Sequence, residues 1–252
     1  MKHVGKTVVV TGGSGGIGKE ICTMFCQEGA KVFFTYLRNK QGAESFAKQL
    51  TERGYGIKAI QCDVSNHLEV SRAFADILSK TDGVDILINN AGISCDSLLV
   101  NMTPEIWENV IGTNLNGAFY CIREVIPYMM ENRWGAIINI SSVMGSVGWP
   151  GLSHYAASKA GIDALTRGCA TELGRFNITV NSIAPGLLLT DMSEDARGRV
   201  GDKVRKLTPL RRYGSPQDVA KLVNFLASED ARFITGEVYM IRGGLGSGLT
   251  IS

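Results

Sequence analysis

Hydrophobic positions along the chain alternate between short β-branched runs and longer segments with helical spacing. The first run is Thr7–Val10, and the segment 17–28 places Ile21, Met24 and Phe25 on one face before ending at Gly29. The remaining strands are predicted at 31–36, 57–64, 84–92, 136–142, 178–185 and 237–244, and the remaining helices at 41–53, 68–79, 104–133, 154–173 and 216–226. Unbroken apolar strands indicate that both faces of the sheet are covered.

This alternation predicts an α/β fold: a single doubly wound parallel sheet of the Rossmann type, with helices on both faces, in one domain over residues 1–252. A (β/α)8 barrel fits the length, but it needs an eighth β-α unit that the pattern does not supply. Segment 187–209 lacks a strand pattern and is rich in charge, so we expect a mobile lid there.

Composition narrows the classes of function. The formal net charge is only +2, which argues against a nucleic-acid partner or a polybasic membrane anchor. The first apolar run is too short for a signal peptide, and no segment has the length of a membrane span, so we expect a cytoplasmic protein. The six cysteines are scattered without a Cys-x-x-Cys pair. They predict buried thiols in a reducing compartment and no metal site.

A glycine-rich segment, Thr11-Gly12-Gly13-Ser14-Gly15-Gly16-Ile17-Gly18, follows the first strand. Pyrophosphate requires backbone N–H donors at close range. Glycines remove the Cβ atoms that would block its approach, and the helix starting here directs its positive end at the anion. A tight turn without a ligand is the alternative, but the position at the start of a βαβ unit favours dinucleotide binding. The predicted contacts are Gly12, Ser14, Gly15, Gly16, Ile17 and Gly18.

The spacing Thr11-Gly12-x-x-x-Gly16-x-Gly18 resembles that of the short-chain dehydrogenase/reductase family. Further motifs of this family occur in order along nearly the whole chain: Asn89-Asn90-Ala91-Gly92, Asn114, Ser142, Tyr155-x-x-x-Lys159, Pro185-Gly186 and Thr190. The resemblance implies that Asp63 accepts a hydrogen bond from adenine and that Thr11 and Asn89 hold strand ends together. The further cofactor contacts that we assign are Val64, Asn90, Ala91, Gly92, Tyr155, Lys159, Pro185, Gly186, Leu188 and Thr190.

The end of the second strand bears on the choice of nicotinamide cofactor. NAD-binding Rossmann proteins usually carry an acidic residue here for the ribose 2′-hydroxyl, but this chain reads Thr35-Tyr36-Leu37-Arg38-Asn39-Lys40. Arg38 and Lys40 could attract a 2′-phosphate, although they could also be a solvated charged loop. NADP(H) is therefore favoured over NAD(H). Gly15 stands where many NADP(H)-preferring relatives have a basic residue, which weakens the preference.

Tyr155 and Lys159 are one helical turn apart and face the same side. An ammonium group near a phenol lowers its pKa and makes it a better general acid. Ser142 ends a central strand, where its hydroxyl can stabilise negative charge on a carbonyl oxygen. The resemblance assigns Tyr155 as the proton donor, Lys159 as its partner, Ser142 as the group that orients the carbonyl, and Asn114 as a holder of water.

The substrate is less closely specified. Residues 94–100, 185–192 and 233–236 resemble the branch of 3-oxoacyl-acyl-carrier-protein reductases. In that branch Arg133 matches a docking position, whereas Phe176, beside Arg175, replaces a second one. For an isolated surface charge, plain surface is the more common interpretation of either arginine. Trp149, Pro150, Met192 and 187–189 could line an acyl channel, or they could seal a lid or an interface.

We therefore expect reduction of a 3-oxoacyl thioester on carrier protein or coenzyme A. The alternatives are a dehydrogenase of small sugars or alcohols and, from another class, a non-catalytic nucleotide sensor, which predicts the loss of a catalytic position. The resemblance further implies a homotetramer, for which the apolar side chains Val110, Leu115, Phe119, Ile122 and Ile126 could serve. We expect the glycine-rich ending, 243–248, to be flexible.

Overall fold

The computed structural model describes residues 1–194, 197–198 and 202–246. Its seven strands form one parallel sheet in the order β3-β2-β1-β4-β5-β6-β7. The strands are β1 (Thr7–Val10), β2 (Lys31–Tyr36), β3 (Ile57–Gln61), β4 (Ile86–Asn89), β5 (Gly135–Ile140), β6 (Ile178–Pro185) and β7 (Val238–Ile241). The predicted doubly wound sheet is confirmed. The barrel alternative is wrong, because β3 and β7 are open edges.

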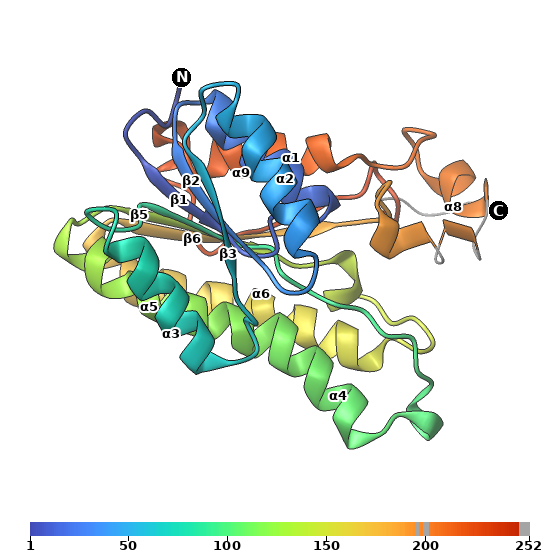
Figure 1. Ribbon diagram of the computed structural model, residues 1–252. Helices are drawn as coiled ribbons and strands as arrows, with labels where there is room; N and C mark the ends of the chain where they lie inside the picture. The colour runs from blue at the N-terminus through green and yellow to red at the C-terminus, as the bar shows by residue number, and fades with distance from the viewer. Residues whose placement is uncertain (195–196, 199–201, 247–252) are drawn as a thin grey trace.

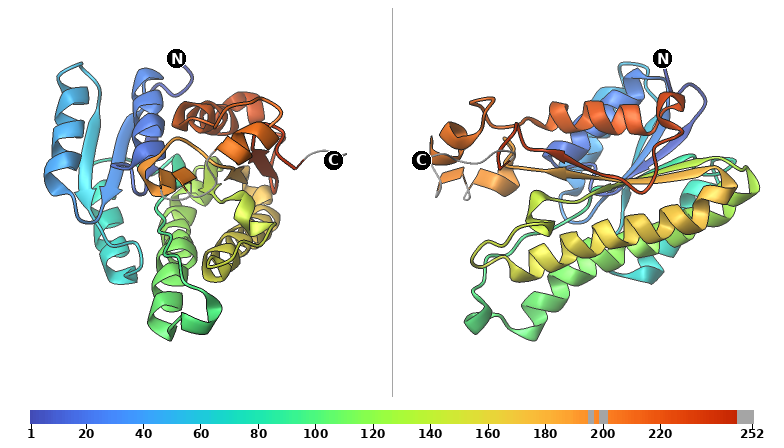
Figure 2. Two further views of the ribbon diagram at one scale, coloured as in Figure 1. Left: turned by 90° about the vertical axis from the view of Figure 1, so that its right-hand side faces the viewer. Right: turned by 180° about the vertical axis from the view of Figure 1, so that it is seen from behind.

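Helices cover both faces of this sheet (Figure 1). One face carries α1 (Gly16–Gln27), α2 (Lys40–Thr51) and α9 (Pro216–Leu226); the other carries α3 (His67–Leu78), α5 (Gly117–Glu131) and α6 (Ser153–Leu173). Helix α4 (Pro104–Ile111) leads into α5 and extends past one end of the sheet, and the short α8 (Asp202–Leu207) lies toward the same end but on the opposite side of the sheet, as the view from behind shows (Figure 2).

Successive residues of each strand enter two separate cores. Val8 and Val10 pack with Phe25 of α1 on one face, whereas Val9 packs with Phe74 of α3 on the other. All five side chains are almost completely buried, and each contributes roughly 2 kcal/mol of hydrophobic stabilisation. This two-sided burial explains why the central strands have no polar alternation in their sequence.

Several predicted element ends differ from the observed ones. The strands predicted at 57–64, 84–92 and 237–244 are shorter, at Ile57–Gln61, Ile86–Asn89 and Val238–Ile241. After each of these strands, apolar residues or glycines continue the pattern that predicted a strand, but the backbone there no longer pairs with the sheet. Strand β3 is also partly exposed because it forms an edge, so the expectation of two covered faces is wrong for this strand.

The helix predicted at 104–133 is interrupted by a π-helical turn. Residues Gly112–Asn116 form this turn between α4 and α5. Such turns add a residue to the helical repeat and are frequent at functional sites. Its buried member is Asn114, one of the predicted catalytic residues.

The segment after β6 is partly structured rather than without elements. It contains a short 3-10 helix, Asp191–Ser193, and α8. The guanidinium of Arg197 donates to the carbonyl oxygens of Leu188 and Thr190, at 3.0 and 2.7 Å. Positions 195–196 and 199–201 of the predicted lid, and the end of the glycine-rich tail from 247 onward, lie outside the described residues. The mobility of the lid stays a prediction.

Candidate active site

The strand order reverses between β1 and β4, and this is where ligands bind in open α/β sheets. The glycine-rich turn follows β1 there, and the backbone of Gly12 is in the left-handed region, with φ of 62°. A Cβ atom on Gly18 would lie 2.4 Å from the Gly12 carbonyl oxygen, so only glycine fits. Gly15 caps α1 in an extended conformation, and the first turn of α1 contains no acidic residue. The start of this helix therefore suits a phosphate.

The neighbouring strand end holds this turn in place. Thr11 Oγ1 accepts from the backbone N–H groups of Asn90 and Ala91, both at 3.0 Å, and Asn90 Nδ2 donates to the carbonyls of Thr11 and Gly12, at 2.9 and 3.0 Å. Both amide hydrogens of Asn90 are thus engaged within the protein. A cofactor contact by the Asn90 side chain would therefore have to use its oxygen. Gly92 has no side chain, so a contact there would use its backbone.

Tyr155 and Lys159 lie on the same side of α6, as their spacing predicts. The Lys159 amine lies 5.6 Å from the centre of the Tyr155 ring and donates to the carbonyl oxygen of Ile140, at 2.8 Å. Ser142 lies at the end of β5, where its hydroxyl accepts from the backbone N–H of Met144, at 3.2 Å. A Cβ atom on Gly92 would stand 3.5 Å from the Lys159 amine. The predicted residues are therefore brought together at the carboxyl edge of the sheet.

Burial dominates the protonation of this group. It lowers the pKa of Lys159 to about 8, against a smaller opposing effect of the Asp163 charge. Burial also raises the pKa of Tyr155, and a hydrogen bond with Ser142 opposes that rise. Lys159 is not among the groups that shift the Tyr155 pKa in this arrangement, so the lowering of the tyrosine pKa by its lysine stays a prediction.

Asn114 is held from two sides in the π-helical turn. Its amide donates to the Ile93 carbonyl and to Ser158 Oγ, both at 3.0 Å, and its oxygen accepts from the Ile93 N–H, at 2.8 Å. The same oxygen would stand 3.3 Å from a Cβ atom on Gly92. Asn114 therefore links the loop after β4 to the helix that carries Tyr155. Its predicted contact with water stays a prediction.

The predicted adenosine end of the site lies on β2 and β3. Arg38 and Lys40 are exposed, but the Lys40 amine lies 3.8 Å from a Glu44 carboxylate oxygen. Asp63 accepts from the backbone N–H and the hydroxyl of Ser65 through the same oxygen, at 2.9 and 2.7 Å. Its other carboxylate oxygen and the exposed Arg38 are the groups most available to a nucleotide. Val64 is buried and packs where Gly117 approaches.

A loop after β6 approaches the glycine turn. Pro185 ends β6, and a Cβ atom on Gly16 would lie 3.3 Å from the Thr190 methyl group. Leu188 is buried and forms a bridge to Gly214, so its side chain belongs to the protein interior and a cofactor contact would come from its backbone. Among the predicted rim residues, Trp149, Leu189 and Met192 are 48%, 53% and 59% exposed.

The residues predicted for carrier-protein docking and for assembly lie in different places, and only some of them are exposed. Arg133 and Arg175 precede β5 and β6, so they lie at the amino edge of the sheet, opposite Tyr155. There Arg133 donates to the Arg175 carbonyl, at 2.9 Å. Of the predicted assembly face, Val110 and Ile122 are buried in the chain's own interior, whereas Phe119 is 43% exposed. Val110 and Ile122 are therefore not available for a contact between chains, and the homotetramer stays a prediction.

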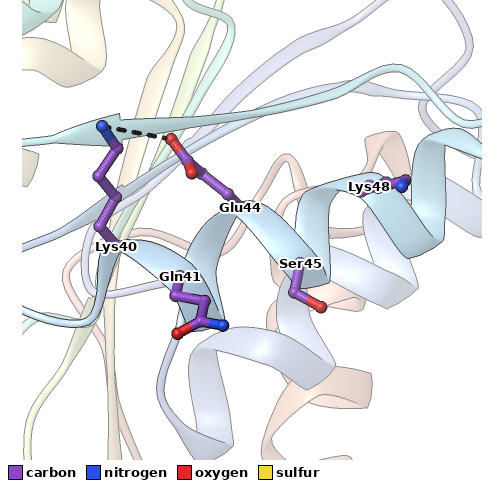
Figure 3. A pocket seen from close by; sticks show the side chains of 5 residues that line it. All are labelled: Lys40, Gln41, Glu44, Ser45 and Lys48. Atoms are coloured by element: carbon purple, nitrogen blue, oxygen red, sulfur yellow. Dashed lines mark ion pairs between the residues drawn. The ribbon is translucent and has the colours of Figure 1, made fainter.

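A hollow of about 450 Å³ lies on the outer side of α2, away from the carboxyl ends of β4 and β5. Figure 3 shows its lining side chains Lys40, Gln41, Glu44, Ser45 and Lys48 along a single helix. It has no part in the chemistry around Tyr155. Within the described residues no acidic, histidine and cysteine side chains cluster in a way that could hold a metal ion. No described helix is long and apolar enough to cross a membrane.

Sequence reasoning missed two groups in this region. Asp163 is buried one turn after Lys159 and accepts from Ser182 Oγ, at 2.8 Å. The signal for Asp163 was available, since Tyr155, Lys159 and Asp163 repeat at the same helical spacing. Arg197, which contacts the Leu188 and Thr190 carbonyls, had no comparable signal because its segment lacks a regular pattern.

These features define a class of protein. A Rossmann sheet whose first helix starts at a glycine turn, with a buried lysine and a tyrosine beside it, is the arrangement of a nicotinamide-dependent oxidoreductase. The fold fits the cofactor, since the glycine turn packs closely against the neighbouring strand end and the first helix starts there without an acidic residue in its first turn.

Comparison with known proteins gives the family. Residues 12–246 match the family model described as enoyl-(acyl carrier protein) reductase. The chain is 40% identical over 240 residues to 3-oxoacyl-(acyl-carrier-protein) reductase FabG of Staphylococcus epidermidis, covering 95% of this chain and 98% of that protein. It is 38% identical over 245 residues to the protein of the same name from Thermotoga maritima, covering 97% and 99%. The chain belongs to the short-chain dehydrogenase/reductase family and is an oxidoreductase that acts on CH–OH groups.

A solved structure from Agrobacterium tumefaciens, named as a gluconate dehydrogenase, matches with a TM-score of 0.94 and 30% identity. It covers 98% of each chain. The near-complete overlap confirms the fold over the whole length. The names of the relatives and of this structure refer to different substrates, so the family and the fold leave the substrate to be argued from the site.

Proposed function

We propose that this protein reduces a 3-oxoacyl thioester to the 3-hydroxyacyl form, with NADPH as the reductant and an acyl-carrier-protein or coenzyme A as the thiol carrier, in a fatty-acid or polyketide type of synthesis. The observation that carries the proposal is the placement of Tyr155, Lys159 and Ser142 beside the glycine turn. The 3-oxoacyl substrate is supported by the name shared by two relatives at 38% and 40% identity over nearly the whole chain.

In this proposal the nicotinamide supplies a hydride to the carbonyl carbon. The Tyr155 hydroxyl donates its proton to the carbonyl oxygen, so that the ketone becomes a secondary alcohol and the phenol becomes a phenolate. Ser142 donates a hydrogen bond to the same oxygen as negative charge develops on it. The Lys159 ammonium stabilises the phenolate and can donate to the ribose. Asn114 holds the loop carrying Gly92 against α6, which fixes the space beside Lys159.

The preference for NADP(H) rests on charge at the end of β2. Arg38 is exposed and, among the described residues, has no acidic partner, whereas Lys40 faces Glu44. An unpaired guanidinium can form two parallel hydrogen bonds to a 2′-phosphate. We therefore assign the 2′-phosphate to Arg38 and only a weaker attraction to Lys40. Asp63 offers its second carboxylate oxygen to the adenine amino group.

The substrate would enter over the exposed apolar side chains of Trp149, Leu189 and Met192. Arg133 and Arg175 remain candidates for docking an acidic carrier protein. Because they lie at the opposite edge of the sheet from Tyr155, they could dock a carrier only for the active site of another chain. The docking proposal is therefore tied to the proposed homotetramer.

A second candidate is a dehydrogenase of a small sugar acid or polyol, which the name of the Agrobacterium structure favours. A non-catalytic nucleotide sensor is disfavoured, because every predicted catalytic position is present. The test measures kcat/KM for a 3-oxoacyl group on acyl-carrier-protein, on coenzyme A and on a small thiol, and for sugar acids, each with NADPH and NADH. We expect the 3-oxoacyl thioesters with NADPH to exceed all others. Faster turnover of sugar acids, or equal rates with NADH, would contradict the proposal.

A further inference from the structure

Asp163 is a buried carboxylate that the proposed chemistry does not use. It lies one turn after Lys159 on α6, and the two side chains belong to residues only 6% and 3% exposed. Burying a carboxylate costs several kcal/mol unless hydrogen bonds or an opposite charge compensate for it. The hydroxyl of Ser182 on β6 is one compensating group, at 2.8 Å from Asp163 Oδ1.

The loop after β5 packs closely against the turn of α6 that carries Lys159 and Asp163. The Ser141 hydroxyl donates to the Lys159 carbonyl, at 3.1 Å. A Cβ atom on Gly145 would stand 3.0 Å from the Lys159 carbonyl carbon and 3.2 Å from Asp163 Oδ2, so the loop after β5 packs against the backbone of Lys159 and against the Asp163 carboxylate and excludes solvent from this side of α6. Water has little room to screen the charges there, and their interaction is stronger than it would be at the surface.

Few other charges act on the Lys159 amine. Among the described residues the titratable groups near it are Tyr155 and Asp163, both on α6. The strand β5 contributes the Ile140 carbonyl and the π-helical turn contributes the Asn114 amide, which are uncharged. His154 is buried at the start of α6 with neither ring nitrogen hydrogen-bonded, and it is not among the groups that shift the Lys159 pKa.

We propose that Asp163 is a positioning residue that acts through Lys159: held by Ser182, its carboxylate supplies the counter-charge that keeps the buried ammonium in place beside Tyr155. The two groups do not form a direct ion pair, so the effect is electrostatic rather than a hydrogen bond. The inference rests on the role proposed above for Lys159. It accounts for a buried acid whose second oxygen points toward the glycine of a neighbouring loop rather than toward solvent.

The sign of the effect follows from the charges. Burial already lowers the pKa of Lys159 to about 8, and the negative charge of Asp163 raises it. Removing that charge lowers the pKa further, so Lys159 loses its proton at a lower pH. Carbonyl reduction that needs the protonated amine then declines at a lower pH on the basic side of the rate profile. Activity near pH 6 is little affected, because the amine stays protonated there in both forms.

The experiment compares pH–rate profiles of kcat for the full-length wild type and Asp163→Asn. We expect the basic midpoint to move down by about one pH unit, the lower end of the effect of a nearby opposite charge, and kcat at pH 7.5 to fall by roughly threefold. Asp163→Glu, which keeps the charge, should restore the midpoint. Asp85→Asn removes a partly buried carboxylate at the amino edge of the sheet and should leave the midpoint unchanged.

Two results would overturn the inference: a folded Asp163→Asn enzyme with an unmoved midpoint, or a loss of the same size at every pH, which indicates a purely structural role. Far-UV circular dichroism and the Tm establish folding. If Asp163→Asn does not fold, Ser182→Ala replaces it, since it releases the carboxylate while keeping its charge. We expect a smaller downward shift there, and no shift would contradict the inference. Full activity of Lys159→Met would instead refute the proposed function itself.

Discussion

The two edges of the sheet use polar and charged side chains in opposite ways. At the amino edge these side chains form ion pairs, hydrogen bonds and cation–aromatic contacts with one another. Lys6 lies over the ring of Trp134, at 3.6 Å from its centre, and pairs with Asp85, at 3.0 Å. The Trp134 indole N–H donates to Glu229, at 2.7 Å, and the Arg232 guanidinium lies 4.9 Å from the same ring. These contacts join segments that are far apart in sequence.

At the carboxyl edge the polar side chains are fixed by hydrogen bonds to the backbone of neighbouring strand ends and loops. Lys159, Asn114 and Asn90 each hydrogen-bond to backbone carbonyls, and these bonds fix their position. No side-chain ion pair closes this edge across Tyr155 within the described residues. One sheet thus divides its tasks: ion pairs and cation–aromatic contacts stabilise the amino edge, whereas hydrogen bonds that fix single polar side chains prepare the carboxyl edge for a ligand.

The substitution Tyr155→Phe should have the largest effect on kcat and is the first test of this division. Loss of the proton donor should lower kcat by about 10²- to 10⁴-fold, the usual contribution of a general acid. The free energy of unfolding should change by only about 1 kcal/mol, because a single hydrogen bond to Ser142 is lost. Cofactor binding, followed by NADPH fluorescence, should stay within a few-fold of the wild type. A variant that keeps a tenth of the wild-type rate would show that another group donates the proton.

Substitutions in the glycine turn give the next test, because the same residues pack closely in the fold and are predicted to bind the cofactor. A Cβ atom on Gly18 would lie 2.4 Å from the Gly12 oxygen, but one on Gly15 would meet only that same oxygen, at 3.6 Å. We expect Gly18→Ala to lower the free energy of unfolding by about 3 kcal/mol through overpacking and to weaken cofactor binding. Gly15→Ala is the matched control and should change stability by less than about 1 kcal/mol. Urea unfolding and cofactor titration measure both. Equal behaviour of the two variants would contradict the close-approach argument.

Much of the fold could be predicted because each element has a local cause. The run Thr7–Val10 is apolar on both faces, and Thr103 caps α4 just before Pro104, where its oxygen accepts from the Ile106 N–H, at 3.4 Å. The strand ends were missed where apolar residues continue past the sheet, as at Cys62 and Val64. The π-helical turn was missed because Gly112–Asn116 keeps the hydrophobic spacing of a helix while changing its hydrogen bonds.

The site was predictable as far as spacing and position on a strand determine it. Lys159 follows Tyr155 by one turn, and Ser142 follows a strand, so both could be assigned before the fold was known. The direction of the Tyr155 pKa could not, because it depends on burial and on the hydrogen bond with Ser142, which only the fold determines. The contacts of Asn90 with Thr11 and Gly12 were equally inaccessible, because they join β1 to β4 across 78 and 79 residues of sequence.

The substitution Trp134→Phe tests the contacts at the amino edge, and its expected effect is the smallest of these predictions. Trp134→Phe keeps an aromatic ring but removes the hydrogen bond to Glu229 and weakens the attraction of Lys6 and Arg232 to the ring. These losses should lower the free energy of unfolding by about 1–2 kcal/mol, while kcat stays within twofold because the edge is remote from Tyr155. Trp107→Phe on α4 is the control, since no cation lies over that ring among the described residues, and it should change stability by about 0.5 kcal/mol or less. Urea unfolding and steady-state kinetics on the same preparations separate the two readouts. A fall in kcat well beyond twofold would show that the two edges are coupled and do not divide their tasks.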